Sequence, residues 1–190
     1  MSEARITAGL DRLAALAGEC RALAPQLRRV ADRYASVLRA GGTLYFCGNG
    51  GSAADAQHLA TEYVVRYGAT RRPLAAVALT TDTSLLTAAG NDLGFEQIFS
   101  RQVEALCRPA DLLVLHSTSG RSPNLLAAAC AARARGVATV AFTGRGGALA
   151  AEVDEAVIVP SGETGLIQVL HMALEHLVVE LVEAALLESA

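Results

Sequence analysis

Short runs of almost wholly apolar residues alternate with longer segments of helical periodicity along most of this chain. Five such runs are candidate strands: Thr43–Cys47, Leu74–Leu79, Leu112–His116, Val137–Phe142 and Ala156–Val159. Parallel strands that are covered on both faces have this continuous apolar character. The segments between them suit helices, at 52–67, 96–107, 122–135 and 146–152. The alternation predicts an α/β fold with a doubly wound, five-stranded parallel sheet and right-handed crossovers.

Helical segments flank this predicted core at both ends. Apolar residues recur at helical spacing within residues 1–40, and Pro25 either separates two helices there or opens the second. The last segment, 163–188, is rich in Leu and Val and predicts one long helix. Because no linker or repeat interrupts the pattern, we expect a single domain over residues 1–190, with the α/β core at 41–160.

Composition and charge indicate a compact soluble protein. Apolar residues make up 52% of the chain and charged residues 18%, and the net charge of −3 gives no general attraction to nucleic acid or to anionic membranes. The N-terminal residues include charged side chains, unlike a signal peptide, and there is no stretch of about 18 uninterrupted apolar residues. The four cysteines form no C-x-x-C pair. We therefore expect a cytoplasmic protein with neither a nucleic-acid nor a membrane partner.

All sixteen basic residues are arginine, so the chain contains no lysine. A Schiff base on a lysine is therefore excluded. A P-loop is excluded as well, because its lysine contacts the phosphates. A phosphate group bound here has to be held by backbone N–H groups, hydroxyls and arginine.

The first predicted strand leads into a glycine-rich loop, Gly48-Asn49-Gly50-Gly51-Ser52, and then into a helix. Glycine lets the backbone turn sharply and approach a ligand, and the helix N-terminus offers free N–H groups to an anion. The loop also fits the loose dinucleotide fingerprint, which requires an acidic residue about 20 positions further on. The nearest acid after the second strand is Asp82, more than 30 positions after Gly48. We therefore expect no nucleotide cofactor, while phosphate binding and a merely tight turn both remain open.

A hydroxyl-rich loop, Ser117-Thr118-Ser119-Gly120-Arg121-Ser122, follows the third predicted strand. Ser122 suits a helix N-cap, and Pro123 suits the first helical position. The hydroxyls thus precede a positive helix end, which favours a dianionic phosphate. Capping and turn formation alone also explain such residues. The position of the loop after a buried strand, paired with the glycine loop, favours phosphate.

Polar side chains on two predicted helices are suited to proton transfer or to metal binding. His58 and Glu62 are four residues apart and share one helix face, although a solvated ion pair is the alternative. Gln168 and His176 on the last helix are about 80° apart and loosely share a side. His171 points about 140° away from His176 and is not expected to serve the same site. Imidazoles, a carboxylate and an amide oxygen together also form a candidate zinc site.

Taken in order, these motifs resemble the sugar isomerase (SIS) domain family and, within it, the phosphoheptose isomerases. The resemblance covers essentially the whole chain. It is carried by Cys47-Gly-Asn-Gly-Gly-Ser52, Asp55-Ala-Gln-His58 with Glu62, Arg66-Tyr67, Gly90-Asn-Asp92-x-Gly-Phe95, Ser117-Thr-Ser-Gly-Arg-Ser122, Thr143-Gly144, and Ile167-Gln168 with His171 and His176. Each motif is short, and their order and spacing together make the resemblance specific.

The resemblance implies a flavodoxin-like sheet and a homotetramer built around the N-terminal and C-terminal helices. It implies an aldose–ketose isomerase that interconverts D-sedoheptulose 7-phosphate and D-glycero-D-manno-heptose 7-phosphate through an enediol. Glu62 would then be the base and His176 the acid, on helices of neighbouring subunits. Family members with zinc imply one Zn²⁺ per site, held by His58, Glu62, Gln168 and His176.

The resemblance also implies which residues line the sugar phosphate. They are Asn49, Gly50, Gly51, Ser52, Glu62, Arg66, Asn91, Asp92, Ser117, Thr118, Ser119, Ser122 and Gln168. One departure concerns the two positions before Ile167, where the family often has Asp or a small polar residue followed by Arg. This chain has Gly165 and Leu166 there, which leaves the exact sugar open.

Two other functions remain open on the sequence. A non-catalytic SIS protein, such as the tetrameric partner of the replication initiator, resembles the isomerases along most of the chain but tends to lack the histidine on the final helix. A sugar-phosphate-binding module would keep the serine loop without needing Glu62 and His176 together. Because both residues are present here, the sequence favours the enzyme.

Overall fold

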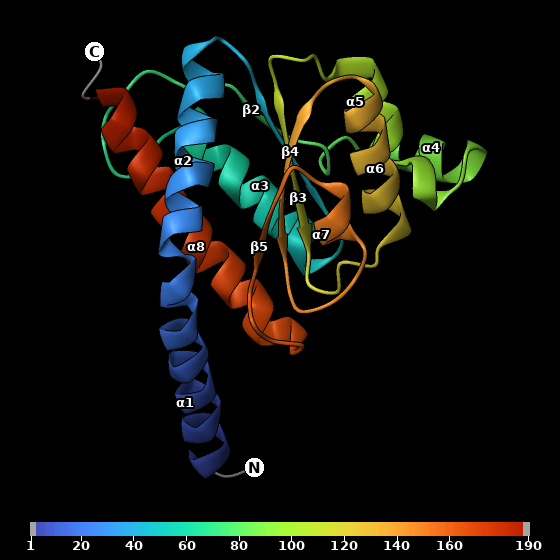
Figure 1. Cartoon of the computed structure of the whole chain (residues 1–190). Helices are drawn as coiled ribbons and strands as arrows, with labels where there is room; N and C mark the ends of the chain where they lie inside the picture. Colours follow the sequence, from blue (N-terminus) through green and yellow to red (C-terminus); the bar gives the residue numbers. More distant parts are fainter. Residues whose placement is uncertain (1–2, 188–190) are drawn as a thin grey trace.

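The computed structural model describes residues 3–187 and contains one parallel sheet between two layers of helices (Figure 1). The strands are β1 (Leu44–Gly48), β2 (Ala76–Ala78), β3 (Leu112–Ser117), β4 (Ala138–Thr143) and β5 (Glu155–Ile158). Their order is β2-β1-β3-β4-β5, and every neighbouring pair is parallel. This is the strand order of flavodoxin-like folds, so the predicted fold class is confirmed.

Three helices cover one face of the sheet: α2 (Ala24–Arg39), α3 (Gly51–Val64) and α8 (Thr164–Leu187). By length and composition alone α8 is apolar enough to cross a membrane, but 44% of its qualifying window is buried inside the protein. Its contacts with α2 and α3 are those of a core helix. This layer therefore packs α8 beside α2 and α3 on one face of the sheet.

The opposite face of the sheet is covered by four shorter helices: α4 (Thr83–Asp92), α5 (Ser100–Leu106), α6 (Pro123–Ala134) and α7 (Leu149–Glu152). Their core is apolar, with Phe99, Val103 and Leu125 all nearly or fully buried. Burying a side chain of this size stabilises the fold by about 1.5–3 kcal/mol relative to leaving it exposed. This layer therefore contributes hydrophobic stability at the back of the sheet.

The N-terminal extension consists of two helices, as the sequence predicts. Helix α1 (Glu3–Glu19) extends away from the sheet, and a 3₁₀ turn (Cys20–Leu23) joins it to α2 (Figure 1). Pro25 lies in the first turn of α2, where a backbone N–H has no partner within the helix, so proline is tolerated there. Pro25 therefore opens the second helix. The predictions for residues 1, 2 and 188 lie outside the described residues.

Two predicted helices are shorter than expected. The helix expected over 96–107 begins only at Ser100 and is preceded by a 3₁₀ turn at Phe95–Gln97. The helix expected over 146–152 begins only at Leu149, because Gly146 and Gly147 adopt φ of +91° and +84°, values outside the helical range. Backbone conformation therefore determines where each helix starts.

Two further boundary predictions are wrong, and one helix was not predicted. The strand expected over 74–79 pairs only at Ala76–Ala78. The helix expected over 52–67 ends at Val64. Helix α4 begins after Asp82, whose side chain accepts a hydrogen bond from the N–H of Leu85 at 2.9 Å, as an N-cap does. The N-cap is the sequence signal that was available for α4.

Candidate active site

The glycine loop and the serine loop lie side by side, because they follow adjacent parallel strands. Gly48 at the end of β1 pairs with His116 at the end of β3. Asn49 and Asn124 join the two loops through reciprocal amide hydrogen bonds of 2.9 and 2.8 Å. Gly50 adopts φ of +56° at the N-cap of α3, a conformation that favours glycine. Both loops thus present a helix N-terminus at the same edge of the sheet.

Hydroxyl groups gather at the start of α6, as the sequence predicts. The Oγ of Ser117 accepts the N–H of Gly120 at 3.0 Å and lies 3.5 Å from the Oγ of Ser122. Ser122 occupies the N-cap position, yet its side chain does not cap the helix. Ser119 is exposed and accepts the N–H of Arg121 at 3.3 Å. Hydroxyls and backbone N–H groups at a helix N-terminus form a site suited to a phosphate.

Three predicted side chains of α3 and α8 converge within one chain: His58, Glu62 and His176. The Nε2 of His58 lies 3.0 Å from Glu62 Oε1 and 3.0 Å from His176 Nε2. The side chains of His58 and Glu62 are 48% and 17% exposed, so the cluster borders solvent. Glu62 and His176 of one chain therefore lie in the same cluster. That the site is shared with a neighbouring subunit stays a prediction.

The geometry of this cluster fits a zinc ion. One ligand atom from each of the three residues lies within 4.8 Å of the others. Tetrahedral zinc with bonds of about 2.0–2.1 Å places two nitrogen ligands about 3.3 Å apart, close to the observed spacing of the two imidazole nitrogens. Two imidazoles and a carboxylate are also a donor set that zinc enzymes use, with the fourth position left for water or substrate.

The fourth predicted ligand, Gln168 of α8, contacts α3 at a different place from the cluster. Its amide packs against Gly51 so closely that a side chain at Gly51 would overlap it. Gly51 is the first residue of α3 and His58 lies two turns further along, near the middle of the helix, so Gln168 and His176 contact α3 about two turns apart. Gln168 and His176 both face α3, so they share a side of α8 as predicted. Gln168 nevertheless lies beside the glycine loop, whereas His176 lies beside His58.

The remaining predicted residues are spread over several parts of the fold. Ser52 is buried in the first turn of α3, Thr118 is half-buried in the serine loop, and Arg66 is exposed after α3. Asn91 donates to Asp92 at 2.7 Å near the end of α4. A cavity of about 580 Å³ between α4 and α5 is lined in part by Asp92 but by none of the other predicted residues, and its mainly apolar lining does not suit a sugar phosphate.

A buried polar layer lies between the cluster and the sheet. His116 of β3 hydrogen-bonds through Nε2 to Glu175 of α8, and both side chains are fully buried. Burial raises the pKa of Glu175; burial alone would lower the pKa of His116, but the Glu175 carboxyl raises it above its usual value. Asp55 lies near His116 and His58, and burial raises its pKa. The layer links β3 to the turn of α8 that carries His176.

His171 lies on the inner side of α8, away from the cluster, as its 140° offset predicts. The side chain is fully buried and contacts the rings of His116 and Phe142. Burial, followed by the neighbouring His116, lowers the pKa of His171 to about 3, so the imidazole is neutral at physiological pH. His171 therefore serves the core of this face rather than the exposed cluster.

Comparison with known proteins places this arrangement in a family. The profile of the family described as the SIS domain matches residues 10–144. The chain belongs to the SIS domain family. Among curated SIS relatives, the phosphoheptose isomerase of Rhodospirillum rubrum is 55% identical over 170 residues, covering 89% of each chain. That of Roseiflexus sp. is 52% identical over 166 residues, covering 87% of this chain and 84% of its own.

Solved structures of the SIS family agree with this assignment. The phosphoheptose isomerase of Neisseria gonorrhoeae superimposes with a TM-score of 0.91 at 41% identity, covering 96% of this chain and 98% of its own. The enzyme from Francisella tularensis gives 0.92 at 34% identity with the same coverage. The chain is therefore an isomerase of the phosphoheptose isomerase branch of the SIS family.

Sequence reasoning missed two contributors to this SIS site. The Tyr67 ring lies 5.3 Å from the His176 ring, centroid to centroid, with an interplanar angle of 31°. Tyr67 belongs to one of the motifs that carry the resemblance, but its contact joins the segment after α3 to α8 and has no local signal. The His116–Glu175 pair also joins distant segments. The signals available for that pair were a histidine within an apolar strand and a glutamate within an apolar helix.

Proposed function

We propose that this chain interconverts D-sedoheptulose 7-phosphate and D-glycero-D-manno-heptose 7-phosphate. The observation that carries this proposal is the convergence of Glu62 with His58 and His176 in one chain, on a fold that also presents a serine loop. The names of the curated relatives support the substrate class. The serine loop would hold the phosphate, and the cluster would act on the carbonyl end of the sugar.

The proposed chemistry moves one proton between two neighbouring carbons. In the direction of the aldose, Glu62 removes a proton from C1 of the ketose, the C1–C2 enediol forms, and the same carboxyl returns a proton to C2. His176 donates a proton to the oxygen on C2 and accepts one from the oxygen on C1. No atom is gained or lost in this exchange, so neither an oxidant nor a nucleotide cofactor is required.

Substrate binding would use the residues of the two loops and their surroundings. Backbone N–H groups of Gly50, Gly51 and Ser52 open α3, and the hydroxyls of the serine loop open α6, so both helix ends favour an anion. We assign the phosphate to the α6 end, where hydroxyls are concentrated. Other proposed contacts with the sugar are Asn49, Glu62, Arg66, Asn91, Asp92, Ser117, Thr118, Ser119, Ser122 and Gln168.

A zinc ion is the proposed cofactor. His58, Glu62 and His176 would hold it, and Gln168 would have to move away from Gly51 to join them. When bound, zinc supplies a Lewis acid that stabilises negative charge on the sugar oxygens. With zinc bound, the second oxygen of Glu62 would still transfer the carbon-bound proton, whereas the coordinated nitrogen of His176 could not, so the acid role of His176 belongs to the zinc-free site.

A homotetramer in the cytoplasm is the proposed form of the enzyme. Ile6 and Leu10 of α1 are 66% and 62% exposed, and Leu177 and Leu181 of α8 are also exposed, which supports burial of these faces against further copies of the chain. The four cysteines are free thiols, which supports a reducing compartment. Light scattering of the purified protein would report a mass about four times that of one chain if the tetramer forms.

The test of the proposed function is conversion of sedoheptulose 7-phosphate, followed by NMR, with and without added Zn²⁺. We expect the signals of a new heptose 7-phosphate whose C1 is an anomeric carbon bearing one hydrogen. If the protein converts a different sugar phosphate and not this one, the substrate assignment is wrong. The departure from the family at Gly165 and Leu166 would then be the first difference to examine. Binding without conversion, under both conditions, would overturn the enzyme and favour a sugar-phosphate-binding module.

A further inference from the structure

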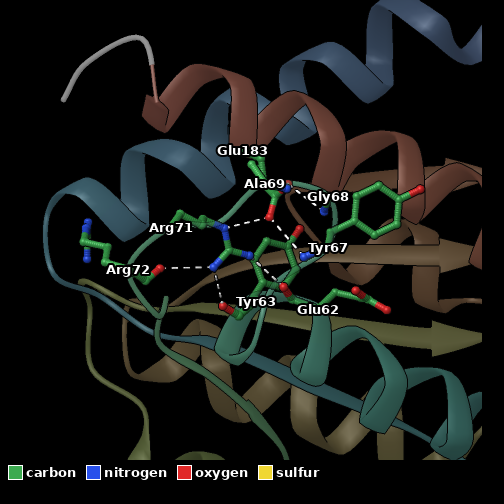
Figure 2. Close-up of polar contacts among 8 residues, drawn as sticks. All are labelled: Glu62, Tyr63, Tyr67, Gly68, Ala69, Arg71, Arg72 and Glu183. Atoms are coloured by element: carbon green, nitrogen blue, oxygen red, sulfur yellow. Dashed lines mark hydrogen bonds and ion pairs between the residues drawn. The ribbon is translucent and has the colours of Figure 1, made fainter.

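A buried carboxylate on α8 holds the segment that follows α3 (Figure 2). The side chain of Glu183 is 6% exposed. Its oxygens accept hydrogen bonds from three consecutive backbone N–H groups, those of Tyr67 at 3.1 Å, Gly68 at 3.0 Å and Ala69 at 3.0 Å. A fourth hydrogen bond of 2.8 Å comes from Nε of Arg71. Glu183 thus fixes the path of the chain directly after α3.

Arg71 extends this contact to the end of α3 itself. Its side chain is 3% exposed, and its terminal nitrogens donate to the carbonyl oxygens of Glu62 at 2.7 Å and Tyr63 at 2.8 Å. A third donation goes to the carbonyl of Arg72 at 3.2 Å. The last carbonyls of a helix have no partner inside the helix, and Arg71 supplies one for two of them. Arg71 and Glu183 together form what we call the clamp.

Stability alone is a poor explanation for the clamp. Taking both charges out of water costs several kcal/mol per ion, and the hydrogen bonds described above offset that cost. Apolar side chains of similar volume often give equal or greater stability at such a position. What apolar side chains cannot do is bind three successive N–H groups and two helix carbonyls. The clamp therefore specifies the position of the backbone.

The positions specified by the clamp are those of the candidate acid and base. Arg71 binds the carbonyl of Glu62 itself. Glu183 binds the N–H of Tyr67, whose ring contacts the His176 ring. Glu183 also lies seven residues after His176, which is about two turns along the same side of α8. In Figure 2 the side chains of Glu62 and Tyr67 both point away from Arg71.

We propose that Glu183 and Arg71 are positioning residues for the isomerase, which fix Glu62 through its backbone and His176 through the ring of Tyr67. This inference rests on the proposed roles of Glu62 and His176. Tyr67 covers one side of the His176 imidazole and limits the rotation of that ring. The clamp keeps Tyr67 there, and it keeps the last turn of α3 at a fixed distance from α8.

The test compares four variants with the wild-type protein, all loaded with Zn²⁺ in the same way. Glu183→Gln removes the negative charge of the clamp and keeps the volume of the side chain. Tyr67→Leu removes the ring and leaves the clamp, and Tyr67→Phe keeps the ring. The matched control is Glu152→Gln, which removes an ion pair with Arg133 on the opposite layer of helices. Measurements are kcat and KM for sedoheptulose 7-phosphate, the melting temperature, and the NMR signals of the His176 ring.

We expect Glu183→Gln and Tyr67→Leu to lower kcat by about tenfold to a hundredfold with little change in KM, because misplaced catalytic groups slow chemistry without weakening phosphate binding. Both should shift the His176 ring signals. Tyr67→Leu should keep the wild-type melting temperature, so that a loss of folding does not explain its effect. Tyr67→Phe and Glu152→Gln should behave as wild type.

Two results separate this inference from the proposed function. If wild type turns over and Tyr67→Leu keeps both its kcat and its His176 signals, the positioning role is wrong while the isomerase stands. If wild type does not turn over, the proposed function fails. The clamp is then judged on NMR alone: shifted His176 signals in Glu183→Gln and Tyr67→Leu support it, and unchanged signals overturn it.

Discussion

The face of the sheet under α2, α3 and α8 buries histidine and glutamate side chains, whereas the face under α4 to α7 buries a core of apolar side chains with two thiols and a few polar groups. On the first face lie the buried His116, His171, Glu175 and Glu183. The second face is built from residues such as Leu125, with the polar Gln102 and the buried thiols of Cys47 and Cys107 among them. The candidate acid and base both lie on the first face.

The two faces therefore have different roles: the apolar face mainly stabilises the fold, and the polar face carries the candidate catalytic groups. Apolar packing tolerates small shifts, but a buried charge has to keep its partners to avoid an uncompensated charge. The polar face therefore holds α3 and α8 at fixed positions relative to each other. Changes on the two faces should have different consequences: loss of turnover on one, and loss of stability alone on the other.

The largest expected effect is that of His176→Ala on turnover. Removing a general acid typically costs about 10²–10⁴-fold in rate, so conversion of sedoheptulose 7-phosphate should fall by that factor. The side chain is only half-buried, so the melting temperature should stay close to that of wild type. Initial rates and thermal melts check both statements, and a variant with the full wild-type rate would remove His176 from the mechanism.

The buried pair should be the most sensitive point of the polar face for stability. Glu175→Leu leaves His116 buried without its partner and should lower the free energy of unfolding by about 3–5 kcal/mol. The double variant with His116→Leu removes both polar groups and should recover part of that loss. Urea unfolding of the single and double variants measures the difference. A double variant less stable than Glu175→Leu alone would contradict this account of the pair.

On the apolar face, Leu125→Ala should destabilise the protein without affecting its chemistry. Leu125 is fully buried, and such a truncation costs about 3 kcal/mol through lost transfer energy and the remaining cavity. Turnover per folded molecule should equal that of wild type at a temperature where both are folded. A lower kcat under those conditions would show that the two faces are more closely coupled than their chemistry suggests.

The smallest of these effects is the pH dependence of the clamp. Burial alone would raise the pKa of Glu183, but the three N–H groups and Arg71 lower it below the usual 4.5. The folded state then binds fewer protons, so the stabilisation is fully present above about pH 4.5 and is lost as the pH falls through the lowered pKa. Wild type should exceed Glu183→Gln by about 1–2 kcal/mol at pH 7, and the difference should shrink in acid. A constant difference down to pH 3 would exclude the carboxylate as the source.

Most of the fold could be predicted from the sequence, because the strands are continuous apolar runs. The five strands, the long α8 and the role of Pro25 follow from local patterns. The starts of α5 and α7 were placed too early: a 3₁₀ turn at Phe95–Gln97 precedes α5, and the pair Gly146–Gly147, a helix-breaking signal in the sequence, precedes α7. Helix α4 lacks a strong apolar stripe, and its N-cap, Asp82, was the available signal.

The candidate site was predictable only as far as single helices. The spacing of His58 and Glu62 places them on one face, and the spacing of His171 and His176 separates them. That α3 and α8 meet depends on how two helices pack side by side on one face of the sheet, which no local pattern records. The clamp could not be predicted either, because Arg71 and Glu183 are 112 residues apart in the sequence.

The most direct test of the central claim is the rate at which Glu62→Gln converts sedoheptulose 7-phosphate, with Zn²⁺ saturating and Glu62→Asp measured alongside. If Glu62 transfers the proton, Glu62→Gln should lose about 10²–10⁴-fold in rate while remaining folded, and Glu62→Asp should keep part of the rate because it retains a carboxylate. A rate for Glu62→Gln equal to that of wild type would show that the convergence of α3 and α8 is not where the proton moves.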